Sequence, residues 1–214
     1  MLDEQMSDCC APDANNQQER RLLWTVLVLN AVMFVIEFSA GWLAQSSGLI
    51  ADSLDMLADA AVYSVSLYAV GRAASHRARA AMLNGGLQLL LGLGVLVDVA
   101  RRIWLGSQPQ ALTMSTISIL ALVVNVSCFL LLFRFRQGDI NLRASWICSR
   151  NDMIANLGVL VAAGLVAWLG AAWPDWFIGA LIAGLIVYSA VYIIRDARIA
   201  LQTGQSVAPS CCGG

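Results

Sequence analysis

Residues 22–44 read LLWTVLVLNAVMFVIEFSAGWLA, a mostly apolar run that contains a single acid, Glu37. A helix that crosses the hydrocarbon core of a bilayer needs about 20 such residues. Windows of the same character recur along the chain, so the sequence predicts an all-α, polytopic membrane protein with six transmembrane helices. The six predicted spans are 22–44, 49–70, 80–100, 112–133, 145–169 and 176–194.

Composition excludes a soluble chain, a disordered chain and a nucleic-acid partner. Hydrophobic residues make up 59% of the 214 residues and charged residues only 13%, whereas soluble domains average about 25% charged residues. The same apolar content excludes intrinsic disorder. The net charge of −1 offers no basic surface for nucleic acid. Membrane lipids are therefore the expected surroundings.

The two ends of the chain are predicted to be short tails. Residues 1–21 are polar, and the apolar run that follows is too long for a signal peptide. We expect a tail at 1–21, a six-helix membrane domain at 22–195 and a second tail at 196–214, with no large soluble domain. Between the spans, residues 72–79 and 134–143 are predicted to be polar loops.

The distribution of Arg predicts the orientation, because cytoplasmic segments of membrane proteins are rich in basic residues. With both termini in the cytoplasm, only Arg101 and Arg102 fall on the outer side, and Arg150 lies within a span. The remaining ten Arg then fall on the inner side: Arg20, Arg21, Arg72, Arg77, Arg79, Arg134, Arg136, Arg143, Arg195 and Arg198. We expect a multi-pass protein of the cell membrane, the inner membrane in a Gram-negative bacterium.

Three acids lie in the second window, where a bilayer tolerates them poorly. Asp55 and Asp59 are four residues apart and Asp52 is three residues before Asp55, so the three share one helix face. An Asp at the centre of a span costs about 3 kcal/mol, so intramembrane acids indicate a function. Neighbouring carboxylates repel one another unless a proton or cation lies between them. Since the window holds no Arg partner, a cation or proton site is expected here.

A second polar face lies in the fifth window, where Cys148, Asp152 and Asn156 are spaced by four residues. Two helices that each contribute a pair at this spacing can enclose one tetrahedral ion, and zinc accepts both Cys sulfur and Asp oxygen. A sulfur ligand favours softer ions. The alternative for Cys148 is a small buried apolar residue. Arg150 points elsewhere on the helix and is a candidate partner for Asp52 or a lipid phosphate.

Other polar residues are assigned secondary roles. Asn30 and Glu37 share a face of the first window and are candidates to line the same cavity, with a helix-packing hydrogen bond as the alternative for Asn30. Asp98 precedes Arg101 and Arg102 and is predicted to form an interfacial ion pair. Two Cys pairs lie in the tails, where metal capture competes with lipidation, redox chemistry or no role: Cys9, Cys10, Cys211 and Cys212.

Small residues in the third and sixth windows are predicted to let helices pack closely, since small side chains allow membrane helices to approach one another. They are Gly85, Gly86, Gly92, Gly94, Gly179, Ala183 and Gly184.

The two acidic helices resemble those of the cation diffusion facilitator family of proton-coupled zinc and heavy-metal exporters. The second window is similar to that family's (His/Asp)-x-x-x-Asp motif at Asp55 and Asp59, including the acid three residues earlier. The fifth window, with Asp152 followed by Gly158-Val159-Leu160, is similar to the family's second His-x-x-x-Asp helix. The resemblance extends through 22–195 and includes the pattern of the first span: Asn30, Glu37 and Gly41.

The resemblance implies one divalent-ion site with four ligands from helices two and five, here Asp55, Asp59, Cys148 and Asp152. The usual His positions hold Asp55 and Cys148, and Asn156 is an alternative to Cys148 as fourth ligand. It also implies that helices three and six form a pair beside a four-helix group. The family's cytoplasmic C-terminal domain has no counterpart in this sequence, so a homodimer would form through the membrane helices.

The expected function is therefore export of a divalent metal from the cytoplasm by proton antiport, with zinc first and cadmium or cobalt as alternatives, and with no prosthetic cofactor. Ion and protons compete for the same groups, because ligands must lose their protons to bind metal. Two alternatives remain: an intramembrane metal-dependent lipid headgroup enzyme, and a metal sensor that does not transport. No nucleophile–base pair supports the enzyme, and no soluble output domain supports the sensor.

Overall fold

The computed structural model describes residues 17–69, 74–133 and 140–203, except for some side chains, among them those of residues 140–151. This part of the chain forms six α-helices: α1 (Gln17–Leu43), α2 (Ser47–Ala69), α3 (Ala74–Leu105), α4 (Ala111–Phe133), α5 (Ile140–Leu169) and α6 (Trp173–Thr203). Among the described residues, five helices are long and apolar enough to cross a membrane: α1, α3, α4, α5 and α6. The predicted all-α membrane bundle is therefore confirmed.

The remaining helix, α2, is as long as α4 but less apolar, because it carries Asp52, Asp55 and Asp59. It lies inside the bundle, where it packs against α1, α3, α5 and α6. An acidic helix at membrane depth requires this position, since its neighbours separate its carboxyl groups from lipid.

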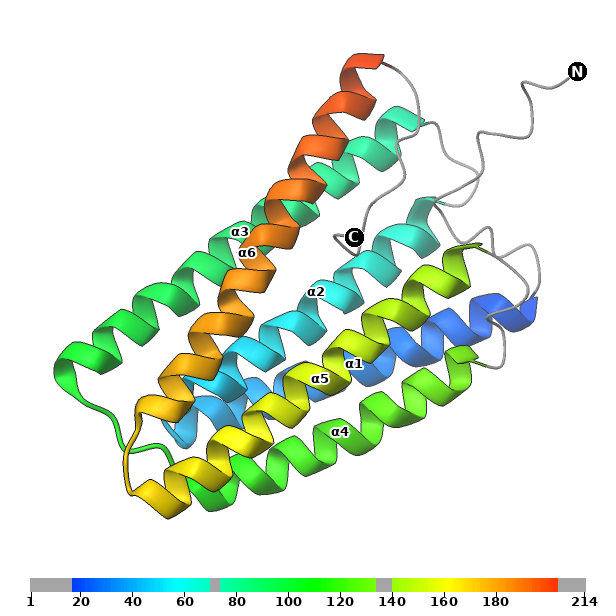
Figure 1. Ribbon diagram of the computed structural model, residues 1–214. Coiled ribbons are helices and arrows are strands. Elements are labelled where there is room, and N and C mark those ends of the chain that lie inside the picture. Colours follow the sequence, from blue (N-terminus) through cyan, green and yellow to red (C-terminus); the bar gives the residue numbers. More distant parts are fainter. Residues whose placement is uncertain (1–16, 70–73, 134–139, 204–214) are drawn as a thin grey trace, which may run out of the picture.

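The six helices run back and forth, so their ends gather at two opposite ends of the bundle (Figure 1). We call one the connecting end, where residues 44–46, 106–110 and 170–172 join α1 to α2, α3 to α4 and α5 to α6. The other is the terminal end, where α1 begins and α6 ends.

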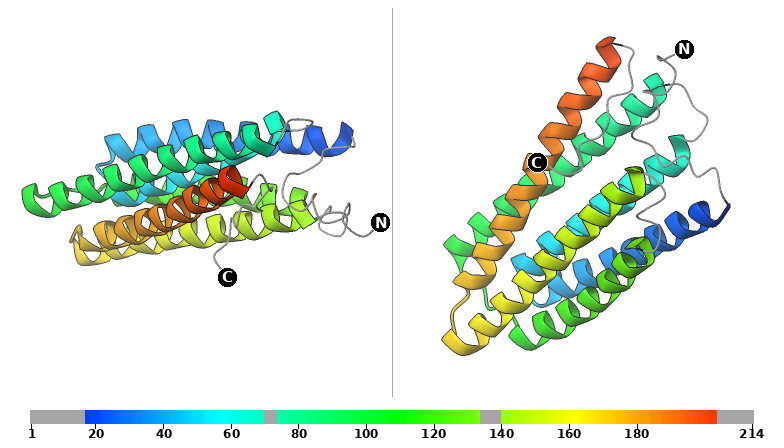
Figure 2. Two further views of the ribbon diagram at one scale, coloured as in Figure 1. Left: turned by 90° about the horizontal axis from the view of Figure 1, so that it is seen from above. Right: turned by 45° about the vertical axis from the view of Figure 1, so that its right-hand side comes forward.

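The helices divide into two groups. The most extensive contacts join α3 with α6, followed by α1 with α2 and α4 with α5. The α3–α6 pair diverges from the other four helices toward the terminal end, in two views of the bundle (Figures 1 and 2). This arrangement confirms the expected pair beside a four-helix group.

Close approach between helices explains only some of the small residues. A Cβ added at Gly92 would lie 2.8 Å from Val187 of α6, and one added at Gly179 would lie 2.8 Å from the backbone of Ser47. Gly85 also faces α6. By contrast, no atom of another described helix lies within 4 Å of a Cβ built on Gly86, Gly94 or Gly184. The prediction of close helix packing is confirmed for Gly85, Gly92 and Gly179 and wrong for Gly86, Gly94 and Gly184.

Two predicted loops are shorter in the structure than in the sequence analysis. α3 begins at Ala74 and α5 at Ile140, so residues 74–79 and 140–143 are helical. Apolar windows detect only the part of a helix that lies in the hydrocarbon, whereas polar residues continue the helix beyond it. α6 likewise continues to Thr203, beyond its predicted span of 176–194.

Candidate metal centre

The acidic face of α2 lies against other helices of the bundle. Asp52 is 1% exposed, and Asp55 and Asp59 are partly buried. The neighbouring residues of α2 are apolar and buried, among them Leu54 and Met56. The predicted stripe of carboxyl groups is therefore an interior feature.

α5 brings a further acid to this face. Asp152 is buried, and its carboxyl group is close enough to those of Asp59, Asp55 and Asp52 to interact electrostatically with all three. One turn further along α5, Asn156 is fully buried. Its Nδ2 donates to the backbone oxygen of Asp152 at 2.9 Å and toward Oδ1 of Asp52 at 3.5 Å. The acids of helices two and five thus converge, as the sequence predicts.

α1 supplies another buried carboxylate. Glu37 is 0% exposed, and it interacts electrostatically with Asp52 and Asp55 of α2. Asn30 is also buried, but its Nδ2 donates to the backbone oxygen of Val26 on its own helix at 2.9 Å. Glu37 therefore lies with the buried acids of α2. The hydrogen bond that Asn30 donates is to its own helix, α1.

The four-ligand centre remains a prediction. Within the described part of the chain, no three His, Cys, Asp or Glu side chains lie close enough together to hold a metal ion. The backbone of Cys148 belongs to α5, but its side chain and that of Arg150 lie outside the described residues. The tail pairs also lie outside them: Cys9, Cys10, Cys211 and Cys212.

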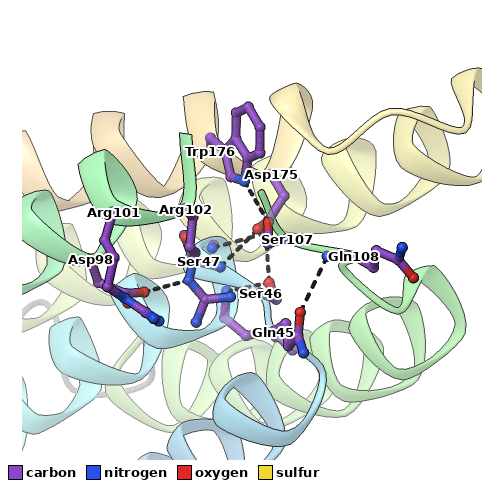
Figure 3. A network of polar contacts seen from close by, with 12 residues as sticks. Gln45, Ser46, Ser47, Asp98, Arg101, Arg102, Ser107, Gln108, Asp175 and Trp176 are labelled. Carbon is purple, nitrogen blue, oxygen red and sulfur yellow. Dashed lines mark hydrogen bonds and ion pairs between the residues drawn. The ribbon is translucent and has the colours of Figure 1, made fainter. Parts of the chain in front are cut away.

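A residue that the sequence analysis did not single out holds the start of α2 (Figure 3). Asp175 lies in the first turn of α6 and is 0% exposed. Its carboxylate accepts hydrogen bonds from Ser46 Oγ at 2.6 Å, Ser47 N at 2.8 Å and Gly48 N at 3.0 Å. Ser46 Oγ in turn accepts from Leu49 N at 3.1 Å. The first backbone N–H groups of α2, which no helical carbonyl can reach, are satisfied in this way.

An Asp at the start of a helix ordinarily interacts with that helix's own N-terminus. Asp175 follows Pro174 at such a position, so the sequence offered a local explanation and gave no sign of a partner 127 residues away. Trp176 continues the same network by donating from Nε1 to Ser107 Oγ at 2.8 Å.

The predicted ion pair at Asp98 is confirmed. Arg101 donates to Asp98 at 3.0 Å, and Arg102 pairs with the other carboxylate oxygen. Arg102 is buried and lies near enough to Asp175 for an electrostatic interaction (Figure 3). These contacts join α3 to the connecting end of α2 and α6.

Six packed helices with acids buried between them define a multi-pass membrane protein of the ion-translocating type. The chain belongs to the cation efflux family, since residues 23–201 match the model described as the cation efflux transmembrane domain. This confirms the resemblance to the cation diffusion facilitators. Members of the family are transporters and not enzymes, which removes the intramembrane enzyme from consideration.

Individual relatives are distant in sequence. The chain is 27% identical over 205 residues to a cadmium, cobalt and zinc/H(+)-K(+) antiporter of Bacillus velezensis, covering 89% of this chain and 65% of that protein. It is 26% identical over 204 residues to zinc transporter ZitB of Yersinia pestis, with the same coverage. It is 26% identical over 191 residues to metal cation efflux system protein CzcD of Cupriavidus metallidurans, covering 84% of this chain and 60% of that protein. The chain thus spans slightly less than two thirds of the first two relatives.

Proposed function

We propose that this chain is a secondary transporter that exports divalent heavy-metal cations from the cytoplasm in exchange for protons. Zinc is the first expected substrate, with cadmium and cobalt as alternatives. Both termini lie in the cytoplasm in this proposal, and residues 22–195 form the membrane domain. A homodimer through the membrane helices is part of the proposal.

The convergence of acids from α2 and α5 supports the proposal most directly. Asp152 interacts electrostatically with Asp52, Asp55 and Asp59, although the hydrocarbon core disfavours each of these charges. A divalent cation provides the opposite charge that such a group requires. Relatives named for zinc, cadmium and cobalt transport are consistent with this cargo.

The proposed ligands are Asp55, Asp59, Cys148 and Asp152, with Asn156 as the alternative to Cys148. Carboxylate and thiolate ligands bind metal only after losing their protons, so metal and protons occupy the same groups alternately. Movement of the α3–α6 pair against the other four helices would expose the ligands to each side in turn, as in transporters that work by rocking. Metal loading and proton release are thereby coupled at one place.

Transport in proteoliposomes tests the proposal. The purified chain should move zinc across the bilayer, and a panel with cadmium, cobalt, manganese and iron(II) should rank the substrates. Liposomes that contain an Asp152→Ala variant at equal density are the control. Metal binding without flux of any ion would favour the sensor and contradict transport.

A further inference from the structure

Glu37 is in an environment that the proposed four-ligand centre does not explain. Its side chain is 0% exposed, and its carboxyl group lies against that of Asp52, another acid, while no N–H or hydroxyl group among the described residues donates to either Glu37 oxygen. Leaving a buried carboxylate unpaired costs several kcal/mol, so such a group normally has a partner of opposite charge or a proton. No described basic residue forms an ion pair with Glu37.

Asp52 of α2 and Asn156 of α5 are also buried polar residues near Glu37. Asp52 is 1% exposed and has no partner at Oδ2, and Asn156 is 0% exposed and has no partner at Oδ1. Asn156 Nδ2 approaches Asp52 Oδ1 at 3.5 Å, and Glu37 interacts electrostatically with Asp52. Three helices therefore bring side-chain oxygens to one buried region in which the described residues provide no basic partner.

Glu37 and Asp52 lie outside the proposed set of transport ligands, and Asn156 enters that set only as the alternative to Cys148. Asp52 lies about one turn from Asp55 on α2, and Asn156 lies about one turn from Asp152 on α5. Both steps lead toward the connecting end of the bundle. The region contributes oxygen donors from α1 as well, and the transport ligands do not include that helix.

We propose that Glu37, Asp52 and Asn156 form a second cation site, made of oxygen donors alone, that binds a hard divalent cation. Two carboxylates match the charge of one divalent ion, whereas a monovalent ion would leave a negative charge uncompensated. Carboxylate and amide oxygens suit manganese, magnesium and calcium, and one or two carboxylates completed by water suffice for the smaller ions. A thiophilic ion would instead prefer the region that includes Cys148.

Manganese(II) binding tests the site without any transport step. The full chain in nanodiscs of zwitterionic lipid is stripped with a chelator and titrated with Mn²⁺, and free Mn²⁺ is measured by electron paramagnetic resonance. The titration is repeated after one equivalent of Cd²⁺ has bound. We expect one Mn²⁺ per chain to remain bound when Cd²⁺ occupies the transport ligands, and any Mn²⁺ that those ligands bind without Cd²⁺ to be additional.

Variants locate the ion. Glu37→Gln should weaken Mn²⁺ binding by about tenfold or more, because even loss of an outer partner of a metal ligand costs about 10–100-fold in affinity. The matched change Asp98→Asn removes a carboxylate at the connecting end of the bundle and should leave Mn²⁺ affinity unchanged. If Glu37→Gln does not fold, Asn156→Asp decides, since a third carboxylate should tighten Mn²⁺ binding.

Several outcomes would overturn the site. They are the absence of Mn²⁺ binding once Cd²⁺ has bound, equal effects of Glu37→Gln and Asp98→Asn, and an Asn156→Asp variant that binds Mn²⁺ no more tightly. The proposed function is tested separately by flux. A chain that binds Mn²⁺ as described but moves no metal would contradict transport and leave the second site in place.

Discussion

Asp152 carries a carboxylate from α5 to the acidic face of α2, and it interacts electrostatically there with three Asp side chains. If it is a metal ligand, Asp152→Ala should reduce metal flux by about 100-fold or more, because even outer partners of metal ligands contribute about 10–100-fold to affinity. Flux is measured in proteoliposomes at matched protein density. Asp98→Asn, which keeps an oxygen acceptor for Arg102, is the control and should retain transport. Full flux in Asp152→Ala would remove Asp152 from the mechanism.

Cys148 decides the selectivity in the proposed ligand set. Thiolate favours softer ions over those that prefer oxygen. Cys148→Ser should therefore weaken cadmium transport more than transport of manganese or cobalt, whereas Cys148→His restores the family's usual ligand. The measurement is the concentration of each metal that gives half-maximal flux. Equal losses for all ions, or none, would favour Asn156 as the fourth ligand.

At the scale of the helix, Asp175 stabilises the start of α2 from α6. Asp175→Ala would leave the N–H groups of Ser47 and Gly48 buried without acceptors. Loss of a cap and of its hydrogen bonds costs about 2 kcal/mol, so the thermal unfolding midpoint in detergent should fall. Asp175→Asn keeps one acceptor oxygen and should show a smaller decrease. An Asp175→Ala protein as stable as the wild type would mean that α2 finds another cap.

Two glycines of α6 provide a matched test of helix packing. A Cβ at Gly179 would lie 2.8 Å from the backbone carbon of Ser47, which cannot move aside as a flexible side chain can. No atom of another helix in the described part of the chain lies within 4 Å of a Cβ at Gly184. Gly179→Ala should therefore destabilise the protein by about 1–3 kcal/mol, the usual range for overpacking. Gly184→Ala should leave the thermal midpoint unchanged or raise it slightly, because Ala favours the helix. Equal midpoints for the two variants would contradict the close α2–α6 contact.

At the scale of the whole molecule, hydropathy predicted the number and type of the helices because each span must be apolar over about 20 residues. The spacing of Asp52, Asp55 and Asp59 predicted their shared face, since helical geometry is regular. Helix ends were predicted less well, because polar residues such as those at 74–79 continue a helix outside the hydrocarbon. The cap that Asp175 provides was missed, because that contact depends on how α6 packs against α2.

The same packing is the basis for an expected movement of the helices. At the connecting end, Asp175 joins α6 to α2, and a buried cluster that includes Leu49, Val95 and Ile186 joins α2, α3 and α6. Toward the terminal end the α3–α6 pair diverges from the other helices (Figure 1). We expect the two groups to rock about the connecting end, which would change access to the acids that α2 and α5 bring together within the four-helix group.

Proton coupling is expected if the proposed carboxylates and the thiol of Cys148 are the metal ligands. Each must lose its proton to bind metal, so metal loading should release protons and metal release should take them up. In inside-out vesicles the lumen corresponds to the cell exterior, so metal entering the lumen should be accompanied by proton exit and a rise in luminal pH, read by a trapped dye. An acidic lumen should accelerate metal entry, and vesicles that contain Asp152→Ala should show neither signal. Full metal flux with no pH change and no response to the imposed gradient would indicate a channel or uniporter, because neither requires a proton to leave the site when metal binds.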